Sequence, residues 1–483
     1  MVKKIGILVT LFVFCQTGLA QELRLKKGVF NEIEVQTDTI TERISIFLPT
    51  IFDSKGKWPL LLVIDLDGNQ NRYMSLFKEV AEDKGYILAA PLGVADSLAL
   101  SKNMVVAQRS INRLREVLPV HNERIYTAGF RNSGRFANLV PIFIKDVAGV
   151  VSVGASLVNI ELLASKNPFY FIGIVGTSDF TYPSLLQDEQ VLNKLKFPNH
   201  LLVHDGDNEL PTTKYLRRAL NLFELSSMAK GFIPKDSALI QSLFKEDLAE
   251  NVKYQSQQEW LLADRSLRET ITAFRTLKDV DSLRRVQKEL RRSKLYKTQY
   301  RSRTATLFNE QLKRDEYNYY LEDDVVTYNF NNLGWWKYQM TQLNAKVNAA
   351  KKEDRKMGLR LIGYINALID DNITLVKADK VVDEEALVLL YMLKTITAPE
   401  ELVHYKNVIS IAAKNLDYGT ALFYAEELLK QGYKDKDAMY TIDYTHLFKI
   451  TPEYNALIEK YLGEPRYKVT REEEPEPAAV IKE

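Results

Sequence analysis

The residues best able to carry chemistry lie between Arg124 and Ala137. This segment, RIYTAGFRNSGRFA, predicts a short strand, a sharp glycine-containing turn and then a helix. Such a turn exposes one side chain at the end of a strand, and the pattern Gly-x-Ser-x-Gly places a reactive serine there. Here the pattern is Gly129-Phe-Arg-Asn-Ser133, so Arg131 takes the nucleophile position. Because a guanidinium is permanently charged and cannot attack a carbonyl, the scaffold is predicted to persist without its reactive atom.

Five segments follow one another in an order that a known enzyme family shares. They are Arg43–Pro49, Trp58–Gly68, Tyr126–Phe130, Gly176–Phe180 and His204–Pro211. On these segments the N-terminal half resembles secreted bacterial α/β-hydrolases of the esterase type. The resemblance implies a serine, an acid and a histidine, in that chain order.

The resemblance carries the acid over to Asp179, but the other two triad positions hold unsuitable residues. The nucleophile position is Arg131, and the histidine position is Asn208, within the segment GDNELP. A carboxamide cannot take and return a proton near neutral pH, and the triad mechanism needs that step. The resemblance therefore implies a pseudo-hydrolase, in which the fold remains and the chemistry is lost.

Two residues could replace the missing groups. Ser133 would need glycine at positions 131 and 135, and both are arginine, so a small helix-filling role is favoured. His204 ends the last predicted strand, where a hydrogen-bonded structural histidine is favoured over a general base. The remaining histidines are assigned no role: His121 and His200, expected at the surface beside strands, and His404 and His446, in the helical half.

A competing motif is Asp65-Leu-Asp67-Gly68, which imitates the strand-end D-x-D-G of haloacid-dehalogenase phosphatases. In that family the first aspartate attacks phosphate and both hold Mg²⁺. Asn69 stands in place of the usual threonine, and the strand is not the first in the chain, so this interpretation is disfavoured. In the esterase layout Asp67 would lie at the oxyanion loop, where its charge would repel a developing oxyanion.

No cofactor and no metal site is predicted, since no His, Cys, Asp or Glu spacing suggests zinc. Asp205, Asp207 and Glu209 could bind a cation, but a solvated acidic loop is favoured. Arg131 is expected to pair with Asp179, or with Asp67 or Asp207, and so to plug the old pocket. The alternative is an anion or carboxylate site built from Arg131 and the elbow amides.

The first half of the chain alternates strands with helices, which predicts a doubly wound, mostly parallel α/β sheet over residues 21–230. Expected strands are Phe30–Val35, Arg43–Leu48, Leu60–Ile64, Tyr86–Ala90, Ile125–Ala128, Val147–Val153, Phe169–Val175 and His200–Val203. Expected helices are Arg72–Asp83, Met104–Leu118, one beginning near Ser133, and Pro211–Phe223.

Residues 236–466 are expected to form an all-α domain because long helical patterns replace the β-branched runs. The expected helices are Gln255–Phe274, Asp281–Tyr296, Gln299–Tyr317, Gly334–Lys351, Arg355–Ile369, Asp383–Thr395, Pro399–Asn415 and Tyr418–Gln431. The segment Asn415–Leu429 resembles the second half of a tetratricopeptide repeat. A solenoid of stacked helix pairs is favoured over a plain bundle.

The first twenty residues read as a secretory signal, with Lys3 and Lys4, an apolar core and a small-residue cleavage site at Ala20. Lipidation at Cys15 is the weaker alternative, since Phe14 precedes it. An exported chain is expected, periplasmic, outer-membrane-associated or extracellular. The formal charge of +2 falls to zero without the two lysines, so nothing points to nucleic acid. No further apolar run reaches membrane-spanning length. Residues 467–483 read as a disordered acidic tail.

These observations favour a non-catalytic scaffold of the bacterial envelope whose helical domain binds a protein partner. A serine hydrolase, an esterase or peptidase with rearranged catalytic residues, is the first alternative. A glycan or small-carboxylate binding protein that keeps the old cleft is the second.

Overall fold

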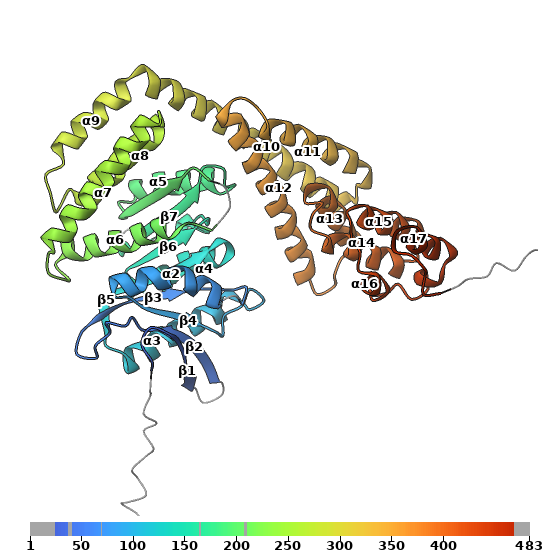
Figure 1. The fold of residues 1–483 in the computed structure, drawn as a ribbon, viewed down its shortest axis with the longest axis horizontal. Coiled ribbons are helices and arrows are strands. Elements are labelled where there is room, and N and C mark those ends of the chain that lie inside the picture. The colour runs from blue at the N-terminus through green and yellow to red at the C-terminus, as the bar shows by residue number, and fades with distance from the viewer. Residues whose placement is uncertain (1–24, 37–40, 69, 164–165, 207–209, 468–483) are drawn as a thin grey trace, which may run out of the picture.

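The computed structural model describes residues 25–36, 41–68, 70–163, 166–206 and 210–467 (Figure 1). The predicted signal segment, nearly all of the predicted acidic tail and residues 207–209 lie outside these ranges. Asn208, predicted from the sequence to replace the triad histidine, is therefore among those not described. Among the described residues, no helix is long and apolar enough to cross a bilayer.

The N-terminal region is built on one eight-stranded sheet with the order β1-β2-β4-β3-β5-β6-β7-β8. β1 and β2 pair antiparallel, β2 and β4 pair antiparallel, and the other neighbours are parallel. The strands are β1 Phe30–Gln36, β2 Thr41–Phe47, β3 Trp58–Val63, β4 Ile87–Pro91, β5 Val120–Phe130, β6 Gly149–Val153, β7 Tyr170–Gly176 and β8 Asn199–His204. The predicted mostly parallel α/β sheet, with its leading antiparallel strand pair, is confirmed.

Helices bury both faces of this sheet, as the continuous apolar runs of the parallel strands require. They are α2 Gln70–Lys84, α3 Leu100–Val117, α4 Arg131–Phe143, α5 Tyr182–Lys194 and α6 Thr213–Lys230. Leu60 and Leu62 of β3 contribute to one core with α3, α4 and α5. Leu61 and Val63 contribute to the other core with α2 and α6. This alternation follows from the two-residue period of a strand.

The C-terminal region is all-helical, as predicted, and much of it surrounds a separate core that includes Trp336, Leu361 and Leu390. Its helices are α7 Ser237–Ser256, α8 Trp260–Phe274, α9 Asp281–Arg292, α10 Lys294–Thr327, α11 Leu333–Val347, α12 Lys352–Ala378, α13 Glu384–Thr397, α14 Val403–Lys414, α15 Tyr418–Lys430, α16 Lys436–Tyr440 and α17 Pro452–Leu462. Figure 1 shows α9 and α10 leading from the sheet side of the molecule to the C-terminal helices.

Two helix predictions are wrong at their boundaries. The single helix expected over Gln255–Phe274 is broken, because Gln258 adopts a left-handed conformation (φ 58°) that ends α7 and turns the chain into α8. The break expected near residue 298 instead lies at Ser293, whose hydroxyl accepts a hydrogen bond from the Tyr296 amide at 3.2 Å. This side-chain cap begins α10, which then runs without interruption to Thr327.

Candidate functional site

The turn between β5 and α4 keeps the backbone geometry of a nucleophile elbow. Arg131, at its tip, has φ of 50°, a conformation that L-residues other than glycine rarely adopt. A Cβ on Gly129 would lie 2.4 Å from the Ser133 carbonyl oxygen, and one on Gly134 would lie 2.7 Å from the Ala155 Cβ. Both glycines are needed for α4 to turn back so closely over β5. The strained position that a catalytic serine occupies in such a turn thus belongs here to an arginine.

The elbow, the end of β8 and the loop that carries Asp179 border one small cavity. We call this loop the acid loop. Arg131, Asp179 and His204 all line it, and its volume is about 10 Å³. Asp179 is buried, and its Oδ1 accepts hydrogen bonds from the amide and the hydroxyl of Thr181, each at 2.7 Å. Burial raises the pKa of Asp179, while the Thr181 hydrogen bonds and the charges of Arg131 and His204 act in the opposite direction.

Ser133 lies in the first turn of α4 and does not line this cavity. Its side chain is fully buried, and its hydroxyl accepts a hydrogen bond from the Leu66 amide at 2.9 Å. That contact ties the start of α4 to the loop after β3. In the same loop the Asp65 carboxylate is fully buried and accepts a hydrogen bond from the Asp67 amide at 2.9 Å. An enclosed carboxylate of this kind does not offer the phosphatase-type nucleophile that D-x-D-G suggested.

The five histidines lie in different environments. His204 lies at the cavity and its ring contacts Tyr215, with centroids 5.1 Å apart. His121 is partly buried, with Nε2 3.3 Å from the Phe232 carbonyl oxygen, and His404 and His446 remain in the helical region. The expectation of a surface position for His200 is wrong. Helix α8 packs beside β8 and buries this ring against Glu269.

The sequence analysis missed that the helical region holds the loop carrying Asp179. Arg360 of α12 is almost fully buried and donates from Nη1 to the Thr177 carbonyl at 2.6 Å. Arg314 of α10 donates to the Phe180 carbonyl at 2.7 Å. Both arginines also pair with the buried Glu310, which compensates their charges. We call these three side chains the Arg–Glu–Arg clamp.

A second contact holds the start of the loop after β8. Lys352 and Lys356 of α12 each bring their Nζ to 3.0 Å from the Asp205 carboxylate. Burial raises the pKa of Asp205, but the two lysines lower it more, to about 2. Asp205, suggested from sequence as one member of a cation site, is therefore bound by ammonium groups. Asp207 and Glu209 lie outside the described residues, and no cluster of three or more His, Cys, Asp or Glu elsewhere in the described ranges could hold a metal ion.

One sequence signal could have revealed these contacts. Lys352, Lys356 and Arg360 recur every four residues, which places them on one face of α12. Glu310 and Arg314 have the same spacing on α10. Such a face is usually solvated, so the pattern alone does not predict that it meets the sheet region.

Comparisons with known proteins give distant structural similarities only. No family model and no curated protein matches this chain. Among solved structures, Est1E from Butyrivibrio proteoclasticus is 13% identical, with 41% of this chain and 99% of that chain covered and a TM-score of 0.35. The fluorophosphonate-binding serine hydrolase F of Staphylococcus aureus is 15% identical over 40% and 96%, with a TM-score of 0.33. The S-formylglutathione hydrolase of the same organism is 16% identical over 41% and 96%, with a TM-score of 0.32.

Proposed function

We propose that this chain is a catalytically inactive hydrolase-fold protein of the bacterial cell envelope that acts as a protein-binding scaffold. The observation that carries the proposal is Arg131 at the strained tip of the elbow. The cation lies beside Asp179 and at the N-terminus of α4, so a guanidinium with no lone pair to donate stands where acyl transfer needs an activated nucleophile.

The size of the cavity supports the same conclusion. A space must offer about 10–15 Å³ to hold one water molecule. The cavity at Arg131 has about 10 Å³, so an acyl group does not fit without movement of the loops around it. This also disfavours a glycan or carboxylate ligand at the elbow, and supports Arg131 as a plug paired electrostatically with Asp179.

The test of inactivity uses the mature chain with p-nitrophenyl acetate and with a fluorophosphonate probe. We expect neither turnover nor labelling. Arg131→Ser combined with Asn208→His is expected to restore little activity, because Asp67 remains at the oxyanion loop. Labelling of the natural chain that disappears in Ser133→Ala would instead support the alternative, a serine hydrolase with rearranged residues. That alternative draws its support from Asp179 and His204, which line the same cavity.

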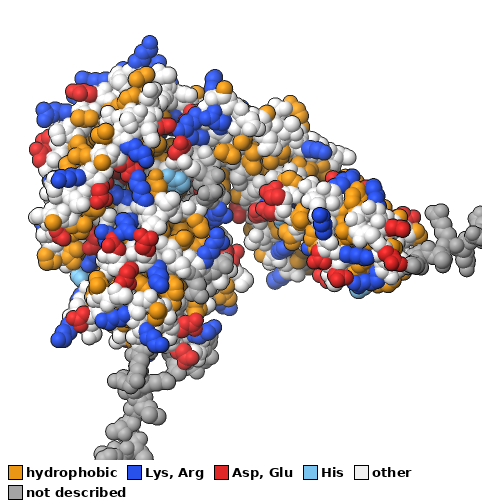
Figure 2. All heavy atoms as spheres, viewed as in Figure 1, with side chains coloured by type: hydrophobic (Ala, Val, Ile, Leu, Met, Phe, Trp, Pro, Cys, Tyr) orange, Lys and Arg blue, Asp and Glu red, His pale blue; other side chains and the backbone are white. Residues whose placement is uncertain are grey.

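The proposed partner surface is an apolar stripe along α10. Phe308, Leu312, Tyr319 and Val326 are all exposed, with Val326 at 73%. Their spacings of four, seven and seven residues keep them within a narrow arc of one helix face. Exposed apolar groups aligned in this way mark sites of protein association. Acidic and basic side chains are interspersed over the face drawn in Figure 2, so a large field of one sign does not dominate it.

Cross-linking in intact cells, followed by purification of the chain, tests this surface. We expect Tyr319→Glu with Val326→Glu to abolish capture of envelope proteins. The matched control is Leu375→Glu, which changes an exposed apolar residue of α12 outside the stripe. Unchanged capture by the double variant would place the interface elsewhere, for example on the sheet region.

A further inference from the structure

A wide groove lies between the sheet region and the start of α10. Its volume is about 700 Å³, and it is lined by residues of α5, α8, α9 and α10. It shares no lining residue with the cavity at Arg131. Binding sites commonly have about 300–1,000 Å³, so the groove has room for several side chains of a partner. We call it the arginine groove, because Arg265, Arg268, Arg291 and Arg303 line it.

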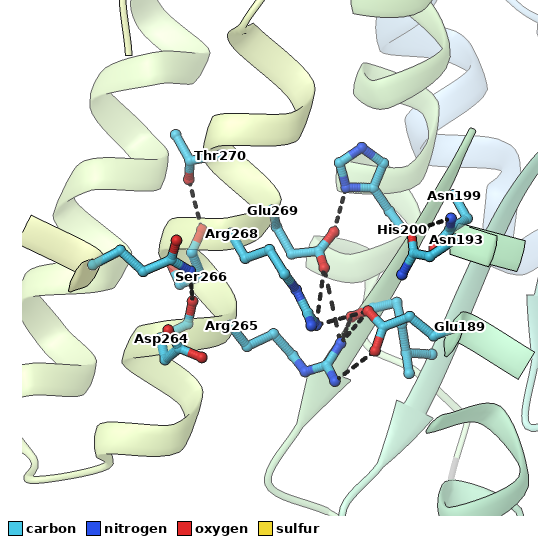
Figure 3. Close-up of polar contacts among 12 residues, drawn as sticks. Glu189, Asn193, Asn199, His200, Asp264, Arg265, Ser266, Arg268, Glu269 and Thr270 are labelled. Atoms are coloured by element: carbon cyan, nitrogen blue, oxygen red, sulfur yellow. Dashed lines mark hydrogen bonds and ion pairs between the residues drawn. The ribbon is translucent and has the colours of Figure 1, made fainter. Parts of the chain in front are cut away.

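Two of these arginines are compensated by acidic side chains. Figure 3 shows Arg265 and Arg268 reaching from α8 toward Glu189 of α5, to which they donate at 3.0 and 2.7 Å. Glu269 lies 3.8 Å from both guanidinium groups. Arg265 is buried, whereas the Arg268 side chain is 36% exposed. Because a guanidinium has five N–H donors, Arg268 keeps donors for a ligand in the groove.

The other two arginines leave an excess of positive charge. Arg291 donates to Asp264 at 2.5 and 3.2 Å, and its side chain is 45% exposed. Arg303 forms no ion pair with any described residue, and its guanidinium lies over the Tyr300 ring, 5.5 Å from the centroid. Of the Arg303 nitrogens only Nε is buried, so the two terminal nitrogens can donate to a carboxylate. The groove therefore offers accessible guanidinium groups to an acidic ligand.

A basic stretch of the chain borders the groove. Between Arg284 and Arg303 the sequence holds nine Lys or Arg and one Glu. Two of these nine cations pair with a described carboxylate, Arg284 with Asp281 and Arg291 with Asp264. Figure 2 shows blue side chains along the upper edge of the molecule, where Figure 1 places α9 and the start of α10. A local field of this kind attracts an acidic partner and speeds its association.

Apolar and aromatic side chains accompany these charges. Tyr300 is 45% exposed and Phe308 is 65% exposed, and both line the groove from α10. Leu186 and Leu307 add aliphatic surface to its lining. Phe308 also belongs to the apolar stripe along α10, so the groove and the stripe are continuous. A ligand that matches this lining combines carboxylates with apolar groups.

We propose that the arginine groove binds an acidic segment of a partner protein, in which acidic side chains alternate with apolar ones. The carboxylates accept from Arg268, Arg291 and Arg303, and the apolar side chains pack on Tyr300 and Phe308. A bilayer surface is too flat to reach the lining of a groove, and a nucleic acid has no aliphatic side chains for the apolar wall. This inference rests on the proposed scaffold function, since it names the chemistry of the partner.

The test measures binding of a fluorescein-labelled synthetic peptide to the full chain by fluorescence anisotropy in physiological salt. In this peptide pairs of glutamates alternate with single leucines. Two control peptides replace every glutamate by glutamine, or every leucine by serine. We expect saturable binding of the acidic peptide and no binding of the glutamine peptide. The serine peptide should bind at least roughly tenfold more weakly, because it buries no leucine on the apolar wall.

The variant Arg303→Gln identifies the site. It removes a cation that has no carboxylate partner, so the melting temperature should change little. Affinity for the acidic peptide should fall roughly tenfold, the change expected when one hydrogen bond to a charged group is lost. Arg301→Gln is the matched control, because Arg301 is an exposed arginine of the same helix that does not line the groove. We expect this control to lower the affinity by less than about twofold, since salt screens charges outside the contact.

Four results would overturn the proposal. The first is the absence of binding by the acidic peptide, and the second is equal binding by either control peptide. The third is an equal loss of affinity in Arg303→Gln and Arg301→Gln, which would mean that the basic stretch as a whole attracts acidic chains. The fourth is tighter binding of oligothymidylate or of phosphatidylglycerol vesicles than of the acidic peptide.

Failure of this inference and failure of the scaffold proposal can be distinguished. Capture of envelope proteins through the stripe is tested with Tyr319→Glu and Val326→Glu, and neither residue lines the arginine groove. Capture that depends on the stripe, without binding of the acidic peptide, would keep the scaffold function and reject an acidic partner segment. The esterase and labelling assays are likewise independent of the peptide assay.

Discussion

The Arg–Glu–Arg clamp gives the sharpest stability prediction, through the change Arg360→Met. This guanidinium is 1% exposed and donates to Glu310 at 2.8 Å and to the Thr177 carbonyl at 2.6 Å. Removing one partner of a buried ion pair costs about 3–5 kcal/mol, because the other charge stays buried. Since Arg314 still binds Glu310 at 2.7 Å, the lower end of this range applies, and we expect a loss of about 3 kcal/mol.

The effect should be localised where α12 meets the acid loop. Hydrogen exchange by mass spectrometry should show faster exchange over residues 177–181, because their contact with the helical region is lost. Urea unfolding should shift to lower denaturant, with the sheet region and the helical region separating into two transitions. Arg355→Met is the control, since Arg355 lies on the same helix and donates only to the nearby Ala349 and Ala350 carbonyls.

The reasoning would be refuted if Arg360→Met changed stability by less than about 0.5 kcal/mol, the size of an ordinary surface substitution. It would also be refuted if residues 177–181 kept their protection while stability fell. The first outcome would mean that the clamp contributes nothing measurable. The second would mean that Arg360 stabilises the helical region alone and does not hold the acid loop.

Three further predictions rest on single contacts. Gly129→Ala should lose about 3 kcal/mol or more of folding free energy, because its Cβ would lie 2.4 Å from the Ser133 carbonyl oxygen. Gly334→Ala, with open space around it, should not destabilise the chain. Thermal melts compare the two variants. Burial raises the pKa of Asp188 from 3.8 to about 6, so the folded state keeps a proton that the unfolded state releases. Stability should therefore fall by up to about 3 kcal/mol as pH rises from 4 to 6. Urea titrations of Asp188→Asn should lack this slope, and an equal slope in both chains would contradict the assignment. Lowering the pH from 4 to 2 should weaken the contact of Asp205 with the two lysines, because a carboxyl whose folded pKa is about 2 loses its stabilisation as it is protonated. Asp205 is half-exposed, which limits the loss of folding free energy to about 1 kcal/mol. Lys352→Met with Lys356→Met should remove this pH dependence from the acid unfolding curve.

Local sequence patterns were enough to predict the sheet and the elbow. Leu60–Ile64 and the other predicted parallel strands are short apolar runs bounded by turns, a pattern typical of strands that are buried on both faces of a sheet. Gly129 and Gly134 flank the elbow because the close approach of α4 to β5 leaves no space for a side chain. The type of residue at position 131 could likewise be read directly. These features depend on neighbours within a few residues, so the linear sequence contains them.

The tertiary structure decided the features that join distant segments. Only packing brought α12 to the Asp179 loop, 183 residues apart at the contact of Arg360 with Thr177. Only packing buried His200 beneath α8, closed the space at Arg131 to about 10 Å³ and opened the groove of about 700 Å³ beside α10. An arginine or a histidine has the same sequence pattern whether its side chain is solvated or buried against a partner. Its partners are set by how helices dock, and many weak apolar contacts spread over the whole chain determine that docking.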